Sequence, residues 1–246
     1  MANAVQRLSV FFPAYNEADN IARTVNQAKK VLQKLDFQSY EIIIVNDGSS
    51  DATARIADKL AANDTHIRVI HHQQNRGYGS ALISGFAAAR YDWVVFTDSD
   101  GQFDFAEIEK FLPLAVDHDA VLGYRVKRQD HAMRRLNAGA WGSLMKLNFG
   151  FQVRDIDCAF KLVRNDSIKS IWPLEASGAF VSTELIVKLK QSGASIAEVG
   201  VTHYPRTAGQ STGANFDVIK KAFIEMRQLR HELKSKAVAK ERADSA

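Results

Sequence analysis

The sequence has little of what marks secreted or membrane-spanning proteins. Its 246 residues include one cysteine, Cys158, which excludes an internal disulfide, suits a reducing compartment and fits a small core position. No run approaches about 18 consecutive apolar residues, so no segment is predicted to span a bilayer. The N-terminal apolar run is interrupted by Pro13 and lacks the arrangement of a signal peptide. We therefore expect a cytoplasmic protein.

Excess charge of one sign is also scarce. The net charge is only +4, so bulk charge does not indicate a nucleic-acid partner. A content of 46% hydrophobic and 24% charged residues is that of a soluble globular protein rather than a disordered or fibrous one. The length suits one large α/β domain and does not require two.

The first half of the chain alternates strand-like and helix-like segments. Short runs of β-branched and aromatic residues, typical of strands buried on both faces, occur at 7–14, 41–47, 66–72 and 92–98. Helical patterns lie between or after them, at 18–35, 50–63 (with Ser50 or Asp51 as the N-cap) and 79–91. This alternation predicts an α/β fold with right-handed crossovers, a Rossmann-like, mainly parallel sheet flanked by helices.

The second half is less regular. A basic stretch at 124–135 leads into an amphipathic stretch at 136–151. We then expect a strand at 158–164, a helix at 182–193 and a further strand at 195–204. A loop at 205–216 precedes a long helix that begins at 216. The last helix carries an apolar stripe formed by Phe216, Ile219, Phe223, Met226, Leu229 and Leu233. We expect the last dozen residues, which are charged and rich in alanine, to fray.

Carboxylates follow three of the predicted strands at the point where each strand ends. Glu17 and Asp47 follow the first two, and the sequence VVFTDSDGQFD places Asp98 and Asp100 after the fourth. In a parallel sheet these ends share one edge, where ligands bind. Carboxylates and phosphate oxygens are the ligands that Mg²⁺ prefers, and Gln102 offers a further oxygen. The sequence therefore predicts a cation site there.

A solvated acidic turn before a helix is the alternative to a cation site. We adopt it only for Asp104, which is predicted to cap the helix that follows it.

Five motifs occur in the order and spacing of a known family. They are FFPAYNEADNI, EIIIVNDGSSDAT, NRGYGSALISGF, TDSDGQFD and RDIDCAFKL. Over roughly residues 7–210 the chain resembles the family 2 glycosyltransferases of the nucleotide-sugar, A-type fold, and within them the dolichol- or polyprenyl-phosphate sugar synthases. The resemblance implies a single catalytic domain over 1–214, followed by a C-terminal amphipathic helix and tail over 215–246.

The resemblance also implies roles for residues on the donor side. Pro13, Tyr15 and Glu17 would line the nucleobase and ribose pocket, and Asp47 would contact the base. Asp98 and Asp100 match the family's Asp-x-Asp motif, which binds Mg²⁺ or Mn²⁺ and the donor diphosphate. Gln102 falls where the synthases carry a second metal ligand, and Asp155 matches an acid ahead of a Cys-Gly-Phe or Ser-Gly-Phe signature. That signature reads Cys158-Ala159-Phe160 here.

Gly77 and Gly79 match a glycine-containing turn of the family. An ordinary helix entry explains them equally well. A dinucleotide-binding loop is disfavoured, because no third glycine follows in register and the first strand ends in PAYNE.

Basic residues indicate how phosphates are held. Arg125, Arg135 and Arg206 are candidate partners of a diphosphate leaving group or a phosphate acceptor, whereas Lys127 and Arg128 read as solvated. A phosphomonoester is already mostly dianionic at neutral pH and needs no general base. A hydroxyl acceptor, the alternative, would need a base such as Asp155 or Asp157. The family's processive members carry Gln-x-x-Arg-Trp, which is absent here and favours a single transfer.

Apolar and basic side chains suggest a partner surface. Trp141, Leu147 and Phe151 follow the basic stretch, and the C-terminal helix adds lysines and arginines to its stripe. Such a helix can lie in a membrane interface, or it can pack against the sheet. A polyprenyl phosphate acceptor would require a surface of this kind or a separate membrane-protein partner. The loop 205–216 is predicted to close over the donor. A further alternative is a nucleotide-sugar-binding protein without catalysis.

Overall fold

The computed structural model describes residues 5–126, 141–142, 144–150, 153–206, 208 and 216–244. Seven strands form one sheet in the order β3-β2-β1-β4-β6-β5-β7. Their bounds are β1 Arg7–Ala14, β2 Ser39–Asn46, β3 Ile67–His71, β4 Trp93–Phe96, β5 Ala120–Arg125, β6 Lys161–Arg164 and β7 Ile196–Val201. All the pairings are parallel except those of β6, which runs antiparallel to β4 and to β5. The predicted mainly parallel α/β sheet is confirmed.

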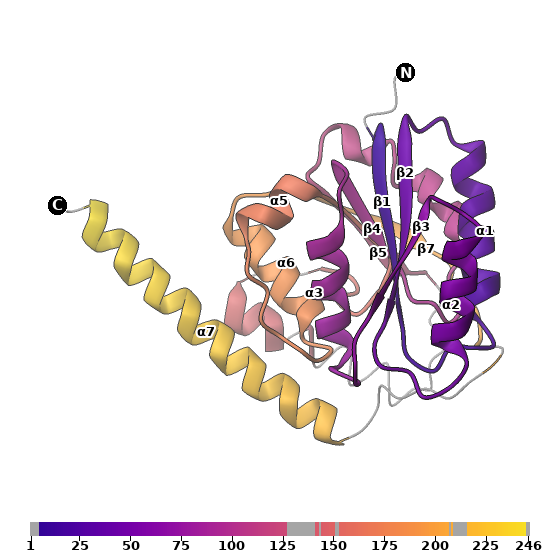
Figure 1. The fold of residues 1–246 in the computed structure, drawn as a ribbon. Coiled ribbons are helices and arrows are strands. Elements are labelled where there is room, and N and C mark those ends of the chain that lie inside the picture. The colour runs from indigo at the N-terminus through magenta and orange to yellow at the C-terminus, as the bar shows by residue number, and fades with distance from the viewer. Residues whose placement is uncertain are drawn as a thin grey trace.

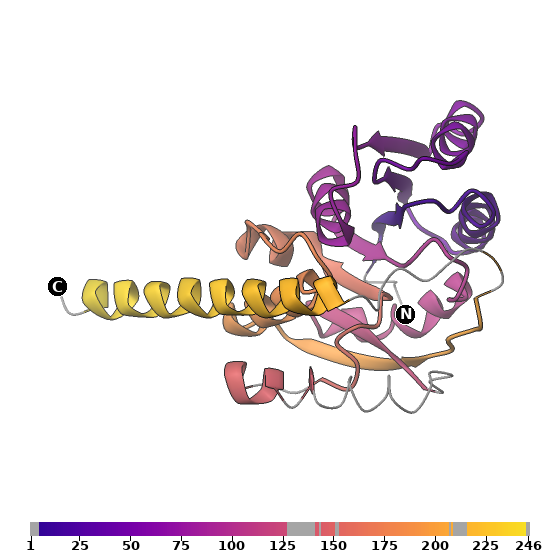
Figure 2. The same cartoon turned by 90° about the horizontal axis from the view of Figure 1, so that it is seen from below.

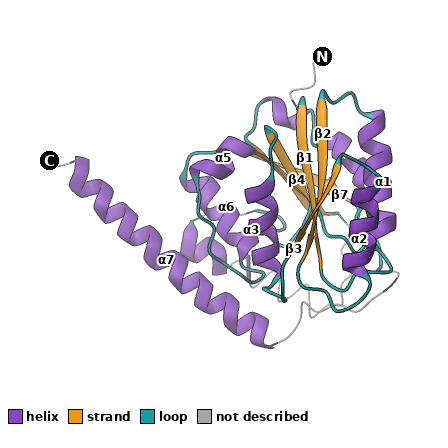
Figure 3. Cartoon of the chain, viewed as in Figure 1, coloured by secondary structure: helices purple, strands orange, loops and turns teal. Residues whose placement is uncertain are grey.

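Helices cover both faces of the sheet (Figures 1 and 3). Figure 1 shows α1 (Ile21–Lys34) and α2 (Thr53–Ala62) on one face, and α3 (Tyr78–Ala88), α5 (Asn165–Ser170) and α6 (Val181–Gln191) on the other. This division follows from right-handed crossovers, because the connections β1 to β2 and β2 to β3 advance along the sheet while β3 to β4 returns. Strands buried between two helical layers need apolar side chains on both faces, and β1, β2 and β4 are buried over most of their length.

Aromatic rings fill the core beneath α3. Phe11 of β1 stacks on Phe96 of β4 at 5.3 Å, and Phe86 of α3 meets Phe11 edge-on at 5.0 Å. A Cβ at Gly85 would lie only 2.4 Å from Phe11 Cδ2, so the absence of a side chain lets α3 approach the sheet. Cys158 is fully buried, as expected of a small core residue.

One local prediction was wrong. The N-cap of α2 is Ala52 rather than Ser50 or Asp51, although Asp51 Oδ1 accepts a hydrogen bond from Thr53 N at 2.9 Å. α7 extends over Phe216–Asp244, and fraying of its last residues stays a prediction. That segment contains neither glycine nor proline and is rich in alanine, lysine, arginine and glutamate, which are strong helix formers. Figure 2 shows α7 projecting well beyond the sheet.

The predicted cap at Asp104 is confirmed. Its Oδ1 accepts from Ala106 N at 3.0 Å at the start of a 3₁₀ helix, Phe105–Lys110.

Candidate functional site

The site begins at the carboxyl end of β4, with Asp98 and Asp100. The Tyr78 hydroxyl, at the first residue of α3, donates to Asp98 Oδ1 at 3.1 Å. Burial and the negative charge of Asp100 raise the pKa of Asp98 to about 7, although the Tyr78 hydrogen bond acts in the opposite direction. Burial and the charge of Asp98 raise the pKa of the Tyr78 hydroxyl well above its usual range, so it remains a donor. A carboxyl group whose ionisation is disfavoured by a neighbouring carboxylate forms a centre that a cation would stabilise.

Contacts from β1 and α1 support the turn that carries these acids. Ser99 Oγ donates to the Pro13 carbonyl at 2.7 Å, and Thr24 Oγ1 donates to the Ser99 carbonyl at 3.0 Å. Gly101 has a φ of +75°, and a Cβ there would lie 2.7 Å from Arg23 Nη2. A side chain at Gly101 would therefore be strained by the backbone conformation, and it would also displace the end of the Arg23 side chain, which explains the glycine. The turn is held by protein contacts on both of its sides.

Gln102, the predicted second metal ligand, lies in the same turn. Its backbone N–H donates to Asp100 Oδ1 at 3.0 Å, so Gln102 lies beside the acid pair. Its side-chain amide nitrogen donates to the Tyr204 carbonyl at 2.9 Å, and Tyr204 N donates to the Gln102 carbonyl at 2.8 Å. These bonds join the turn to the segment that follows β7, and the metal-ligand role of Gln102 stays a prediction.

A charge network joins the N-terminus of α1 to the same segment. Arg206 pairs with Glu17 through Nη2 and approaches Asp100 Oδ2 to 3.6 Å through Nη1. Asn20 Nδ2 donates to Glu17 Oε2 at 2.7 Å, and Arg206 Nε donates to the Ala208 carbonyl at 2.8 Å. The structure therefore brings together three residues that sequence reasoning placed in one site: Glu17, Asp100 and Arg206.

The other two residues predicted for the nucleobase pocket adjoin this network. Pro13 is buried in β1, and Tyr15 is 39% exposed just beyond the end of that strand. Tyr15 thus has a surface on which a base could stack.

Asp47, predicted to contact the base, is buried at the end of β2. Its Oδ1 accepts from His72 Nδ1 at 2.6 Å and from Arg76 N at 2.9 Å, and its Oδ2 accepts from Gly77 N at 2.9 Å. Both carboxylate oxygens therefore hold the turn that precedes α3. A contact with the base stays a prediction.

Gly77 and Gly79 lie where α3 begins against a neighbouring loop. Gly77 has a φ of +96°, and a Cβ there would lie 2.6 Å from the Ser177 carbonyl oxygen. A Cβ at Gly79 would overlap the Ala176 carbonyl oxygen. The helix start and the close packing both favour glycine at these positions, as the helix-entry interpretation expects. A role of the two glycines in donor binding stays a prediction.

Arg125 and Asp155 form a buried bidentate pair. Arg125 Nε lies 2.7 Å from Asp155 Oδ2, and Nη2 lies 2.8 Å from Oδ1, with the side chains 11% and 3% exposed. Burial would lower the pKa of Arg125, but the Asp155 carboxylate outweighs it and raises that pKa. The two residues predicted for phosphate binding and for acid–base work are thus partners of each other.

Lys161, whose charge acts on Asp98, was not predicted from the sequence as part of the site. It is fully buried at the start of β6, where Nζ donates to the Ile156 carbonyl at 3.0 Å and to the Cys158 carbonyl. Burial lowers the pKa of its ammonium group, against the effect of Cys158 and of nearby aspartates. Tyr78 was also missed. A lysine inside an apolar run and a tyrosine between two glycines give no sequence signal that separates them from ordinary residues.

The oxygen donors of this site fit a divalent cation. Among the described residues, no group of three His, Cys, Asp or Glu side chains could hold a metal ion. Asp98 and Asp100 provide two carboxylates, an arrangement that suits Mg²⁺ or Mn²⁺ when the substrate's phosphates complete the coordination. Arg135, Lys127 and Arg128 lie outside the described residues, as does most of the predicted closing loop.

Fold and site together define an α/β protein with an acidic centre at the carboxyl edge of a mainly parallel sheet, the edge at which such folds bind ligands. The sequence model of Glycosyl transferase family 2 matches residues 9–172, which is more than half of the chain. The chain belongs to glycosyltransferase family 2, as its motifs predicted.

Two curated relatives illustrate the similarity. The chain is 33% identical over 207 residues to "Glycosyltransferase AglD" of Haloferax volcanii, covering 81% of this chain and 33% of that protein. It is 26% identical over 215 residues to "Undecaprenyl-phosphate mannosyltransferase" of Micrococcus luteus, covering 83% of this chain and 86% of that protein. The chain thus spans about a third of AglD and most of the shorter relative.

A solved structure shares the fold. Glucosyl-3-phosphoglycerate synthase from Mycobacterium tuberculosis, crystallised with Mn²⁺, UDP and glucosyl-3-phosphoglycerate, superposes with a TM-score of 0.66. The match covers 94% of this chain and 80% of that one, at 20% identity. The predicted A-type fold is confirmed.

Proposed function

We propose that the protein transfers a sugar from a nucleotide diphosphate donor to a polyprenyl phosphate, with inversion and with a divalent cation. The observation that carries this proposal is the pair Asp98 and Asp100, in which the charge of Asp100 raises the pKa of Asp98 at the edge where A-type sheets bind ligands, so that a cation there would stabilise the ionised pair. Bound Mg²⁺ or Mn²⁺ would neutralise charge on the departing diphosphate. Asp98 and Asp100 would hold it, with Gln102 as a further oxygen donor.

The remaining residues of this site would position the donor. Tyr15 offers an exposed ring beyond β1, and Glu17 lies beside it at the start of α1. Arg206 already lies against Glu17 and Asp100, so its guanidinium is within reach of a diphosphate bound at the acid pair. A guanidinium in this position would stabilise the negative charge on the leaving diphosphate without moving a proton.

The arrangement around Asp155 makes one of the two candidate bases for a hydroxyl acceptor unsuited to that role, and Asp157 is left as the alternative. A hydroxyl needs a carboxylate base, yet both oxygens of Asp155 accept hydrogen bonds from Arg125. A phosphate needs only cationic and hydrogen-bonding partners to be positioned for in-line attack on the anomeric carbon. The similarity to an undecaprenyl-phosphate mannosyltransferase that the chain nearly spans supports the same acceptor class.

A lipid acceptor requires contact with a membrane, and the exposed face of α7 suits it. Within the described part of the chain, no helix combines the length and apolar character needed to cross a bilayer. Between 220 and 235 the exposed positions of α7 carry five cations, two large apolar side chains and no carboxylate. These are Lys220, Lys221, Arg227, Arg230 and Lys234, together with Phe223 and Ile224. We propose that this face, the basic face of α7, meets anionic lipid at the cytoplasmic side of the membrane.

Transfer to an extractable lipid tests the function. Purified protein is incubated with Mn²⁺, labelled nucleotide sugars and undecaprenyl or dolichyl phosphate in detergent. We expect labelled product in the organic phase, dependent on the cation. Product formed only with hydroxyl acceptors would overturn the acceptor assignment. Nucleotide-sugar binding without transfer to any acceptor, membrane extracts included, would instead indicate a binding protein.

A further inference from the structure

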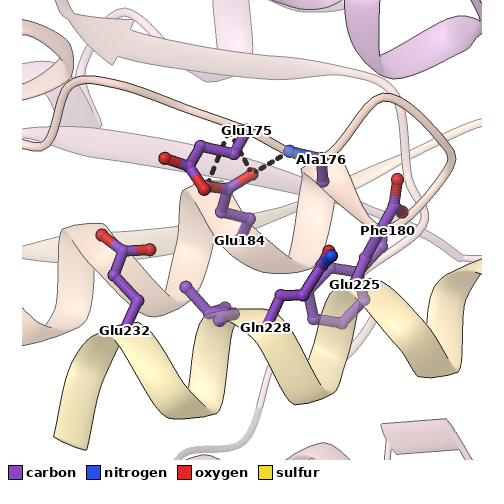
Figure 4. A pocket seen from close by; sticks show the side chains of 8 residues that line it. Glu175, Ala176, Phe180, Glu184, Glu225, Gln228 and Glu232 are labelled. Atoms are coloured by element: carbon purple, nitrogen blue, oxygen red, sulfur yellow. Dashed lines mark hydrogen bonds between the residues drawn. The ribbon is translucent and has the colours of Figure 1, made fainter. Parts of the chain in front are cut away.

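A short loop beside the site is held by two glutamates from two helices. Four consecutive backbone N–H groups, from Glu175 to Gly178, all donate to carboxylates. Glu184 of α6 accepts from the N–H groups of Glu175 at 2.9 Å and of Ala176 at 2.8 Å (Figure 4). Glu225 of α7 accepts through Oε1 from the next two N–H groups, at 3.0 and 3.1 Å. We call residues 175–178 the stapled loop. Charge-assisted bonds of this kind are stronger than those between neutral groups.

α7 contacts the stapled loop with one turn of its length. Glu225 is buried, and the stem of Lys221, one turn earlier, would lie 3.4 Å from a Cβ at Gly178. Gly178 has no side chain, so α7 can approach the loop backbone directly. The loop is therefore held by an element far from it in sequence and adjacent to it in space.

The stapled loop in turn holds the start of α3. Ser177 donates its N–H to Glu225 and accepts, through its carbonyl, the Gly79 N–H at 3.0 Å. Gly79 lies in the first turn of α3, where N–H groups have no partner within the helix. One residue thus connects α7 directly to the N-terminus of α3.

The start of α3 carries two contacts to the acids of the site. Gly77 N donates to Asp47 Oδ2 at 2.9 Å, and the Tyr78 hydroxyl donates to Asp98 Oδ1 at 3.1 Å. Displacement of this turn would move the Tyr78 hydroxyl away from Asp98. A continuous series of hydrogen bonds and covalent segments therefore runs from Glu225 through Ser177 and Tyr78 to Asp98.

We propose that Glu225 is a positioning residue of the site, which sets the Tyr78–Asp98 contact through the stapled loop and so makes α7 a structural part of the donor site. Its effect on donor binding rests on the function proposed above, whereas its effect on the start of α3 does not. A helix whose exposed face suits a membrane is then the helix whose buried face supports the acid pair.

Substitutions on one face of α7 test this proposal. Glu225→Ala removes the acceptor of two loop N–H groups, whereas Glu225→Gln keeps a side-chain oxygen that can accept them. Glu232→Ala is the matched control, because Glu232 lines the same groove between α6 and α7 but pairs with Lys188 Nζ at 3.2 Å (Figure 4). If Glu225→Ala does not fold, Glu225→Asp, shorter by one methylene, replaces it.

The first readout is amide hydrogen exchange in peptides covering 76–82, on the full chain without ligand. We expect exchange to be roughly tenfold faster in Glu225→Ala than in the wild type, close to wild type in Glu225→Gln, and unchanged in Glu232→Ala. Equal acceleration in both alanine variants would mean general loosening of α7 and would overturn the proposal.

The second readout is binding of UDP and of GDP, each with Mn²⁺, by calorimetry. For the nucleotide that the wild type binds, we expect roughly tenfold weaker affinity in Glu225→Ala, in the usual range of coupling between sites. Affinity within about twofold of wild type would overturn the role in donor binding. If the wild type binds neither nucleotide, the proposed function fails, and the exchange experiment still decides the role of Glu225.

Discussion

At the scale of single residues, Asp100 and Asp104 are both aspartates and lie four residues apart, but their surroundings differ. Asp100 is 8% exposed, faces Arg206 and adjoins Asp98, whereas Asp104 is exposed and caps a 3₁₀ helix. We predict that Asp100→Asn lowers the rate of transfer at least about a hundredfold, since it removes a cation ligand that contributes several kcal/mol to the transition state. Product assays at saturating Mn²⁺ measure this effect.

Asp104→Ala is the matched control for that substitution. It should cost about 1 kcal/mol of unfolding free energy through the lost cap and leave transfer unchanged. Equal rates for wild type and Asp100→Asn would remove the cation from the proposed mechanism.

Arg125 and Asp155 allow a second prediction at this scale. Asp155→Ala would remove the bidentate carboxylate from the largely buried Arg125 guanidinium, so we expect a loss of about 3–5 kcal/mol in unfolding free energy. The double variant Arg125→Met, Asp155→Leu replaces the pair by apolar side chains and should recover most of that loss. Urea denaturation measures both. A double variant less stable than Asp155→Ala would contradict this account of the pair.

At the scale of elements, two glycines in helices make opposite predictions. In Gly79→Ala the new Cβ would overlap the Ala176 carbonyl oxygen, which belongs to backbone that cannot easily yield. We expect a loss of about 1–3 kcal/mol in unfolding free energy, together with weaker nucleotide binding. Gly142 lies in a helical segment with nothing within 4 Å of its Cβ position. Gly142→Ala should therefore stabilise the protein by about 0.5–1 kcal/mol. Thermal denaturation compares the two variants. If both were destabilised, the space around the added Cβ would not explain their stability.

The elements also show what sequence patterns can and cannot predict. The strands and helices up to β4 were predicted to within a few residues, because buried parallel strands and amphipathic helices have distinct periodicities. The acids at the strand ends were found for the same reason. The sequence predicted a strand at β6 but not its antiparallel direction. That direction depends on pairing with β4 and β5, which come from distant parts of the chain.

Residue partners were less predictable than residue positions. Arg125 was expected to face a phosphate, but its partner Asp155 is thirty residues away and is set by the direction of β6. The contact of Tyr78 with Asp98 likewise depends on how α3 returns across the sheet. Composition and spacing report one segment at a time, whereas such contacts depend on the arrangement of several.

At the scale of the whole molecule, charge is divided between the two sides of α7. Between 220 and 235 its glutamates, Glu225 and Glu232, face α6, and its lysines and arginines are exposed to solvent. We predict that the protein floats with vesicles containing anionic lipid and does not float with purely zwitterionic ones. Binding should weaken as salt rises from about 0.05 to 0.5 M, because screening shortens the reach of surface charges.

A triple substitution on the basic face of α7 tests this distribution. Changing Lys220, Arg227 and Lys234 to Gln together should abolish flotation. The control changes Lys30, Lys34 and Lys59 to Gln, which removes the same charge from α1 and α2 on the opposite side of the sheet (Figure 1). Flotation lost equally in both variants would indicate attraction by net charge alone.

The reversed direction of β6 has a consequence for how such a protein can diversify. The chain leaves the sheet after Arg125 and re-enters it at Lys161 on the same edge, and the Arg125–Asp155 pair ties the two ends of this excursion together. The two described ends of this excursion are thus fixed at one rim of the sheet. We expect its exposed positions, such as Leu147, to change freely while the seven strands and the Asp98–Asp100 pair keep their places. Met145, which is fully buried, and Trp141, which packs on Phe180, should change only together with the core.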